Sequence, residues 1–163
     1  MHLRDYRPDD ADAVLALNAA SVALLSPLDA LQLRALAAQA ALHRVAVRDG
    51  ALVGFLLALR EGSPYASPNY RWFAARYPRF LYIDRVVVDA QARGGGIGAA
   101  LYADVFAFAR AAGIDTVACE YDLDPPNPES ARFHARFGFG EVGRQRIAGG
   151  KQVSLQVARP PAH

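Results

Sequence analysis

The stretch from Phe80 to Arg110, FLYIDRVVVDAQARGGGIGAALYADVFAFAR, decides the fold. Its first part, which runs through Val88, is apolar and rich in β-branched residues, as is typical of a buried strand. Four glycines then fall within the five residues from Gly94 to Gly98. From Ala99 onward, apolar residues recur at helical spacing without proline or glycine, which predicts a helix. The stretch therefore predicts a buried strand, a glycine-rich loop and a helix in succession.

A glycine loop between a strand and a helix is suited to bind phosphate. Glycines let the backbone adopt positive φ and let a ligand approach without a Cβ in the way. The first turn of the following helix leaves N–H groups without intrahelical partners, and these groups point along a favourable dipole. We therefore expect the loop to be an anion site, best suited to phosphate.

Two familiar phosphate-binding patterns can be compared with this loop. A P-loop needs Lys followed by Ser or Thr after its last glycine, whereas Gly98 is followed by two alanines, which excludes it. A dinucleotide fingerprint fits the loop from Gly94 to Ala99, and Asp115 or Glu120 would supply the acidic residue expected about 20 positions further on. That fingerprint normally opens the first βαβ unit, whereas this loop lies past the middle of the chain.

A third pattern, Arg-x-x-Gly-x-Gly, spans Arg93 to Gly98 and begins five residues after the last strand valine, Val88. A second motif lies downstream, where Asn127 to Phe139 follows the form N-x-x-x-A-x-x-[FY]-x-x-x-G-F, with His134 at the aromatic position. In order and spacing, the two motifs resemble the two blocks of the GCN5-related N-acetyltransferase (GNAT) superfamily. Together they cover roughly the second half of the chain up to Phe139.

The resemblance implies a fold, a coenzyme and a set of coenzyme contacts. The fold is α/β (α+β), with a single mixed, largely antiparallel sheet of about seven strands flanked by four helices, the acyl-CoA N-acyltransferase fold, in one domain over residues 1–163. The co-substrate is acetyl-CoA, with its pyrophosphate on the loop backbone and its pantetheine arm between the loop strand and the next strand. The implied coenzyme contacts are Val86, Val87, Val88, Arg93, Gly94, Gly95, Gly96, Ile97, Gly98, Ala99, Asn127 and Phe133.

Two further residues are candidate catalytic groups. Asp84 is a carboxylate inside the buried strand, where a charge is costly unless it is paired or lines a cavity. The resemblance implies that it is a general base, acting directly or through water, and an ion pair with Arg85 is the structural alternative. His134 stands where many family members have a tyrosine that protonates the coenzyme thiolate. Imidazolium can donate a proton near neutral pH, so His134 is either the acid or a structural replacement that leaves the step to water, Tyr121 or Tyr82.

The composition excludes several other classes of protein. It is that of an ordinary globular chain, with 53% hydrophobic and 21% charged residues, and a net charge of +2 gives no argument for nucleic acid binding. No apolar run reaches the about 20 residues of a membrane helix, and the charged N-terminus is not a signal peptide. The four histidines are scattered and Cys119 is the one cysteine, so neither a metal site nor a disulfide is expected. We expect a cytoplasmic protein in which Cys119 is buried and inert.

The rest of the chain fits the outline of the family without a diagnostic motif. A helix to about Leu25 and a second helix capped by Ser26 would line one wall of the acceptor site in a protein of this family. The pair Asp49-Gly50 is a strong type I′ hairpin signal. The aromatic, proline-punctuated segment 61–79 is either a substrate wall or a short helix whose aromatic side chains pack on the core.

These expectations converge on an acyltransferase that moves an acetyl group from acetyl-CoA to a primary amine by direct transfer. The acceptor, a small molecule or a peptide, is not fixed by the sequence, and homodimers are common in families of this kind. Nucleic acid, membrane and metal partners are not expected. The alternatives are a non-catalytic sensor module that binds acyl-CoA and a dinucleotide-binding, Rossmann-like oxidoreductase.

Overall fold

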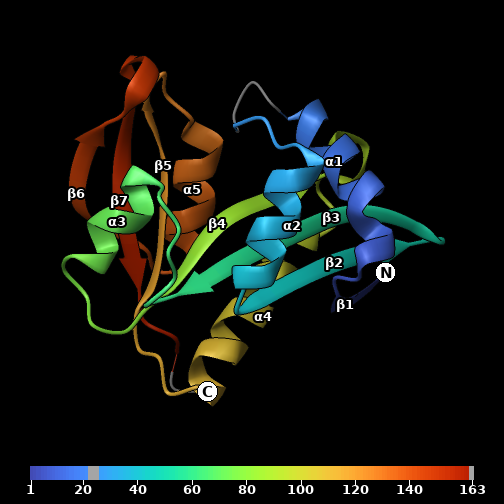
Figure 1. Cartoon of the computed structure of the whole chain (residues 1–163), viewed down its shortest axis with the longest axis horizontal. Coiled ribbons are helices and arrows are strands. Elements are labelled where there is room, and N and C mark those ends of the chain that lie inside the picture. The colour runs from blue at the N-terminus through green and yellow to red at the C-terminus, as the bar shows by residue number, and fades with distance from the viewer. Residues whose placement is uncertain (22–25, 162–163) are drawn as a thin grey trace. The chain divides into compact units, whose positions relative to one another are not determined.

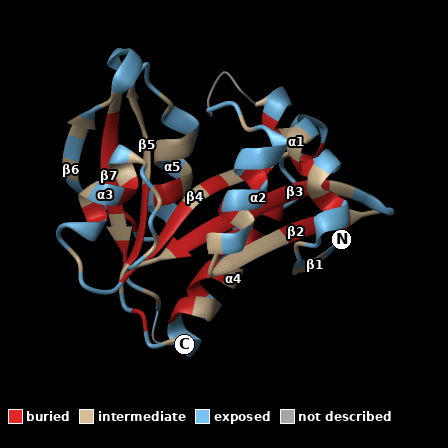
Figure 2. Ribbon diagram, in the orientation of Figure 1, coloured by how far each residue is buried: buried red, intermediate tan, exposed pale blue. Residues whose placement is uncertain are grey.

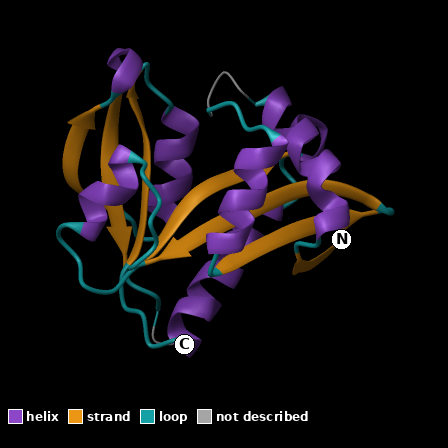
Figure 3. Cartoon of the chain, in the orientation of Figure 1, coloured by secondary structure: helices purple, strands orange, loops and turns teal. Residues whose placement is uncertain are grey.

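The computed structural model describes residues 1–21 and 26–161, and within them seven strands form one sheet in the order β1-β2-β3-β4-β5-β7-β6 (Figures 1 and 3). The predicted fold class is confirmed, although these residues form five α-helices instead of four. The elements are β1 His2–Asp5, α1 Ala11–Ala20, α2 Ala30–Gln39, β2 Leu42–Arg48, β3 Ala51–Arg60, α3 Pro68–Ala74, β4 Leu81–Val88, α4 Ile97–Ala111, β5 Val117–Asp124, α5 Pro128–Arg136, β6 Gly140–Arg146 and β7 Gln152–Ala158, with short 3-10 turns at Pro8–Asp10, Ala90–Ala92 and Ala148–Gly150.

The chain divides into two compact units. The first consists of Met1–Leu59 and Ile83–Val105, and the second of Arg60–Tyr82 and Phe106–His163. The boundary therefore passes through β4 and α4, the strand and the helix on either side of the glycine loop. The prediction of one domain over residues 1–163 stays a prediction.

In the first unit, β1, β2 and β3 pair antiparallel, and α1 and α2 lie over β2 and β3 (Figures 1 and 3). The predicted type I′ turn is confirmed, because Asp49 and Gly50 both have positive φ, at 52° and 78°. The core of this unit is red in Figure 2. Its central cluster takes one or two side chains from each of five elements: Val14, Leu33, Val45, Val47, Phe55 and Val87.

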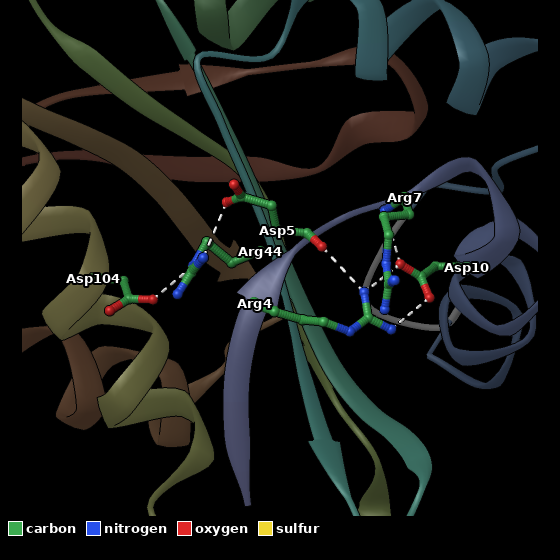
Figure 4. A network of polar contacts seen from close by, with 6 residues as sticks. All are labelled: Arg4, Asp5, Arg7, Asp10, Arg44 and Asp104. Atoms are coloured by element: carbon green, nitrogen blue, oxygen red, sulfur yellow. Dashed lines mark hydrogen bonds and ion pairs between the residues drawn. The ribbon is translucent and has the colours of Figure 1, made fainter.

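Ion pairs fix the edge of this unit (Figure 4). The Arg44 guanidinium donates from Nε to Asp104 on α4 at 2.8 Å and from one NH2 group to Asp5 on β1 at 3.0 Å. Arg4 donates twice to Asp10, at 2.8 and 2.9 Å. Asp10 is the residue before α1, but its carboxylate accepts from Arg4 and the Arg7 N–H and does not cap that helix. Asp5 is well exposed, so its pair with Arg44 contributes little stability and sets position more than free energy.

The boundaries of the two N-terminal helices differ from the prediction. Helix α1 ends at Ala20, and Leu25, to which it was expected to extend, lies outside the described residues. Ser26 does not cap α2, because Asp29 does: its carboxylate accepts from the Gln32 N–H at 2.7 Å, and the Gln32 side chain accepts from the Asp29 N–H at 2.9 Å. This reciprocal capping box satisfies two donors at once and overrides the serine–proline signal upstream.

In the second unit, β7 pairs antiparallel with β5 on one side and with β6 on the other. The aromatic segment forms α3, which Ser67 caps. Tyr70 and Phe73 are buried, so the packing interpretation of this segment holds for them. Trp72 lies against Gly143 on β6, where an added Cβ would approach the indole Cη2 to 3.0 Å. Cys119 is buried as predicted, and burial raises the pKa of its thiol, which opposes a nucleophilic role.

Two kinds of feature are absent from the residues that the structure describes, a membrane-spanning helix and a metal-binding cluster. No helix among them combines the length and apolar character needed to cross a membrane. The same residues contain no cluster of three or more His, Cys, Asp or Glu side chains able to hold a metal ion.

Candidate active site

The glycine loop lies where the sequence placed it, between β4 and α4. Strand β4 ends at Val88, a 3-10 turn follows, and α4 begins at Ile97 and runs for 15 residues. The Asp89 carboxylate accepts from the Gln91 N–H at 2.9 Å and so caps the turn. The first turn of a helix of this length presents N–H groups and the positive end of a dipole to the loop.

The loop leaves its backbone accessible. Gly94 and Gly96 have φ of +84° and +77°, values that only glycine adopts without strain. No heavy atom lies within 4 Å of where a Cβ would stand on either residue. Open space over a backbone that turns into a helix N-terminus is what a phosphate group requires, so the geometry fits the pyrophosphate of a coenzyme.

Gly54 on β3 supports this loop from beneath, a role that sequence reasoning missed. A Cβ on Gly54 would lie 3.1 Å from Ile97 Cγ2 and 3.1 Å from the Val87 carbonyl oxygen. The neighbouring Val53 carbonyl accepts from the Asp89 N–H at 2.8 Å. The absence of a side chain at Gly54 therefore lets β3 approach the end of β4 and the start of α4. A glycine inside an apolar strand is the sequence signal of such a close backbone approach.

Arg48, the last residue of β2, is a second residue that sequence reasoning missed. A Cβ on Gly95 would lie 3.6 Å from a terminal guanidinium nitrogen of Arg48, so this cation lies alongside the loop. Arg48 is half-buried and forms no ion pair with a residue of the ranges 1–21 and 26–161. Its guanidinium is therefore a positive charge beside the glycine loop that no carboxylate in those ranges neutralises.

Asp84 and Arg85 form a nearly buried ion pair on β4, as the structural interpretation of Asp84 predicted. Their side chains are 6% and 9% exposed, and Arg85 Nε lies 3.4 Å from Asp84 Oδ2. Arg85 also donates to the Ser26 carbonyl at 2.7 Å and to Asn18 Oδ1 at 3.1 Å. Asn18 is 1% exposed, so it belongs to this buried network and is not an ordinary solvated polar residue of α1. The pairing with Arg85 explains how a carboxylate is tolerated in this strand. An ion-paired carboxylate can still accept a proton, so the pairing does not rule out a general base.

The three valines that follow alternate about the strand. Val87 is buried in the core cluster, whereas Val86 and Val88 are only half-buried. The first unit thus brings together Asp84, the valines and the glycine loop.

The second unit carries the downstream motif on α5. Asn127 caps this helix, because its Oδ1 accepts from the Ser130 N–H at 3.2 Å. Phe133 is half-buried, with its ring 5.1 Å from that of Phe137. His134 is buried, and its Nδ1 lies 2.7 Å from the Ser130 carbonyl oxygen.

The tautomer of His134 follows from that contact. A carbonyl only accepts, so Nδ1 carries a proton in either charge state. Burial lowers the pKa of His134 below its ordinary value, against the opposing effect of the Ser130 contact. At neutral pH the ring is therefore mainly neutral, which is unfavourable for an acid.

Two tyrosines of this unit have different environments. The Tyr121 ring lies 5.6 Å from the His134 ring, and its hydroxyl accepts from Gln156 Nε2 at 3.2 Å. Tyr82 is 1% exposed and its hydroxyl donates to the Glu120 carboxylate. Tyr121 is half-buried, so it is the more accessible of the two.

Comparison with known proteins identifies the family. The model of the Acetyltransferase (GNAT) family matches residues 13–139, which include both motifs, the glycine loop and α5. The chain belongs to the GNAT family. The sheet order, with antiparallel β7 and β6 after β5, also differs from the doubly wound sheet that the dinucleotide interpretation requires.

Individual relatives of this GNAT chain support the assignment. It is 34% identical over 117 residues to a phosphinothricin N-acetyltransferase of Streptomyces coelicolor, a match that covers 67% of this chain and 58% of the relative. The structure of Ard1 from Thermoplasma volcanium superposes with a TM-score of 0.79 at 19% identity, over 97% of this chain and 96% of that one. The structure of yncA from Salmonella typhimurium, a putative acetyltransferase with its cofactor acetyl-CoA, gives a TM-score of 0.72 at 17% identity, over 100% and 95%. At these identities the two structures show the fold alone.

Proposed function

We propose that this GNAT protein transfers the acetyl group of acetyl-CoA directly to a primary amine. The observation that carries the proposal is the open glycine loop between buried β4 and α4, within a chain that matches the family model over both motifs. The proposal treats residues 1–163 as one catalytic domain, and homodimerisation is part of it only as an expectation from the family.

The coenzyme is held mainly by backbone in this proposal. Its pyrophosphate accepts from N–H groups of the loop from Arg93 to Ala99, and Arg93 and Arg48 add positive charge. Its pantetheine arm pairs with the backbone of Val86 to Val88. Asn127 and Phe133 contact the same arm from α5.

Chemistry begins when the deprotonated amine attacks the thioester carbonyl carbon. Holding both substrates in line supplies much of the rate, because it replaces a bimolecular encounter. The N–H near Val88 stabilises the negative charge on the carbonyl oxygen. Asp84, directly or through water, takes the proton that the attacking nitrogen releases.

Collapse of the intermediate requires a proton for the departing thiolate. His134 and Tyr121 are both candidates, and they lie together in the second unit. Tyr121 is the better donor, because a neutral His134 presents its one N–H to the Ser130 carbonyl. The phenol hydroxyl of Tyr121, in contrast, is both a donor and an acceptor.

Phosphinothricin is the first acceptor to test, because a phosphinothricin N-acetyltransferase is the relative at 34% identity. The match spans only 58% of that protein, so its substrate is not inherited with the family. The segments most able to set acceptor choice are the α1–α2 region and the α3 segment, since neither contains a coenzyme motif.

The test is a titration of the purified protein with acetyl-CoA, in parallel with NAD, followed by thermal unfolding. A ligand at about 100 times its Kd stabilises the folded state by roughly 2.7 kcal/mol, a rise of several degrees in Tm. We expect a rise with acetyl-CoA and none with NAD. No rise with acetyl-CoA would refute the loop assignment, and tight binding without turnover of any amine would replace the enzyme with an acyl-CoA sensor.

A further inference from the structure

Arg48 brings a cation to the side of the glycine loop from a distant part of the sequence. It is the last residue of β2, and the β2–β3 turn follows it directly. Its guanidinium lies alongside Gly95, at 3.6 Å from the Cβ position of that residue. Strand β3 leads back from the turn, and its Val53 carbonyl accepts from the Asp89 N–H at 2.8 Å, just ahead of the loop. Backbone contacts within the first unit therefore fix the hairpin that carries Arg48 against the loop.

The charge of Arg48 has no counterpart in the part of the chain that the structure describes. Within residues 1–21 and 26–161, neither an ion pair nor a hydrogen bond joins its side chain to another residue. Arg44 on the same strand differs, because it donates to both Asp5 and Asp104. A half-buried cation loses part of its hydration, and a partner of opposite charge restores that loss. The position of Arg48 therefore favours an anionic ligand beside the loop.

Coenzyme A offers two kinds of phosphate to such a site. The pyrophosphate is a diester, and the N–H donors of a glycine loop and of the first helical turn are suited to it. The 3′-phosphate on the ribose is a monoester, which carries a charge of about −1.5 to −2 at pH 7 and three strong acceptor oxygens. A planar guanidinium binds such a group through two parallel hydrogen bonds. The monoester therefore gains more from an arginine than the pyrophosphate does.

The loop geometry separates Arg48 from the space suited to the pyrophosphate. At Gly94 and Gly96, no heavy atom lies within 4 Å of the Cβ position, so the space over their backbone is open. At Gly95, in contrast, the Cβ position faces the Arg48 guanidinium. The cation therefore lies beside the loop and not over its open backbone. A second phosphate of the same ligand, joined to the first through the ribose, fits this lateral position.

We propose that Arg48 binds the 3′-phosphate of coenzyme A and makes the protein select coenzyme A over 3′-dephospho-coenzyme A. This inference rests on the proposed function and narrows it, because it assigns the charge of Arg48 to one phosphate of the coenzyme. The loop backbone holds the pyrophosphate, which both compounds contain. Arg48 recognises the one group by which they differ. The β2–β3 hairpin is therefore a specificity element of the coenzyme site, although it contains no coenzyme motif.

The test is a binding cycle with coenzyme A and 3′-dephospho-coenzyme A, which needs no acceptor amine. Isothermal titration calorimetry at one ionic strength gives the Kd of both ligands for the wild type and for R48Q. The wild type should bind coenzyme A about five- to tenfold more tightly than the dephospho form. R48Q should lose this preference, because its affinity for coenzyme A falls while its affinity for the dephospho form stays within about twofold. An equal loss for both ligands would overturn the inference by placing Arg48 on the pyrophosphate.

Controls separate this inference from folding and from the proposed function. R34Q removes an exposed charge from α2 and should leave both Kd values unchanged. R93Q, at the start of the loop, should weaken both ligands by the same factor; a loss of preference in R93Q but not in R48Q would overturn the inference. Thermal unfolding shows which variants remain folded, and R48K, which loses the planar fork, replaces R48Q if the latter does not fold. A wild type that binds both ligands equally refutes the inference alone, whereas one that binds neither refutes the proposed function.

Discussion

The glycine loop and the residues that we propose to transfer protons are built on opposite principles. The loop acts through its backbone: Gly94 and Gly96 contribute positive φ and open space, and the residues are contiguous in sequence. In the proposed function, proton transfer uses side chains: Asp84 on a strand of the first unit, and Tyr121 and His134 in the second. The loop is recognisable as a contiguous motif, whereas the choice between proton donors in the second unit depends on their hydrogen-bond partners.

The contrast teaches which substitutions each region tolerates. A backbone site depends on what is absent, so it fails when a side chain is added. A side-chain site depends on donors and acceptors, so it fails when a single polar atom is exchanged while shape is kept. Three substitutions test this difference, and a fourth concerns a histidine outside both regions.

The largest expected effect is on coenzyme binding by G96V. Valine at φ of +77° strains the backbone and projects methyl groups over the anion site, so acetyl-CoA affinity should fall at least about 100-fold. Isothermal titration calorimetry measures the loss. G62V is the matched control, since Gly62 has φ of +88° with no heavy atom within 4 Å of its Cβ position. Equal binding by G96V and the wild type would mean that the loop backbone does not hold the coenzyme.

The next effect should be on turnover alone. D84N keeps the shape of the carboxylate but cannot accept a proton, so kcat should fall by about 100-fold or more while the Kd for acetyl-CoA stays within about twofold. Steady-state kinetics with the identified amine, together with coenzyme titration, separates the two quantities. D89N, which retains an acceptor for the Gln91 N–H beside the loop, should leave both unchanged. A parallel loss of kcat and coenzyme affinity in D84N would assign Asp84 to structure.

A smaller effect is expected from R48Q, which tests whether the loop acts through backbone alone. Loss of one charge–phosphate contact should weaken acetyl-CoA binding about five- to tenfold and flatten its salt dependence. Arg34 is exposed on α2, so R34Q removes the same charge away from the loop and should leave affinity unchanged. Identical affinities for R48Q and R34Q would show that no side chain of β2 takes part in coenzyme binding.

The last effect concerns a half-buried histidine outside both regions, and it is one on stability that appears only at low pH. Both ring nitrogens of His43 are buried without a hydrogen-bond partner among the described residues, and its ring stacks on Tyr6 at 4.0 Å. Burial lowers the pKa of His43 to about 4, against the opposing charge of Asp10. The folded-state pKa is below the unfolded value, so the unfolded chain binds more protons and stability falls as pH drops below about 6.5.

The variant H43F keeps the ring stack and removes this titration. Relative to pH 7, the wild type should lose about 2 kcal/mol more of its free energy of unfolding than H43F by pH 4.5. Urea denaturation at a series of pH values measures the difference. Parallel pH profiles for the two proteins would show that His43 is protonated equally in the folded and unfolded states. Above pH 6.5, H43F and the wild type should bind the coenzyme equally well.

Much of this structure could be predicted because its signals are local. The β4–loop–α4 succession follows from hydrophobic spacing and glycine chemistry, and the Asp49-Gly50 turn and the Asn127 cap follow from residues adjacent in sequence. The helix boundary at Asp29 was missed because two cap signals lie close together. The side chain of Gln32 decides between them by completing a capping box.

The remaining features depend on contacts between distant residues. Trp72 packs against Gly143, which lies on a strand far downstream in the sequence. The packing of the α3 segment could therefore not be predicted from its own residues. Arg48 reaches the loop only because the β2–β3 hairpin brings it there. The hydrogen bonds from Ser154 to Glu141 and from Gln156 to Ser154 could not be predicted either. The alternation of a strand does not show which polar residues meet across the sheet.

Gly54 limits how the glycine loop could be transferred into another protein. Transferring only the residues from Arg93 to Gly98 would leave out Gly54, which lies some forty positions upstream. Because Gly54 has no side chain, Ile97 can pack closely against that strand. A recipient with alanine at the equivalent of Gly54 would receive the motif intact and displace the start of its helix by a few tenths of an ångström. The unit to transfer is therefore the loop together with the strand segment that contains Gly54.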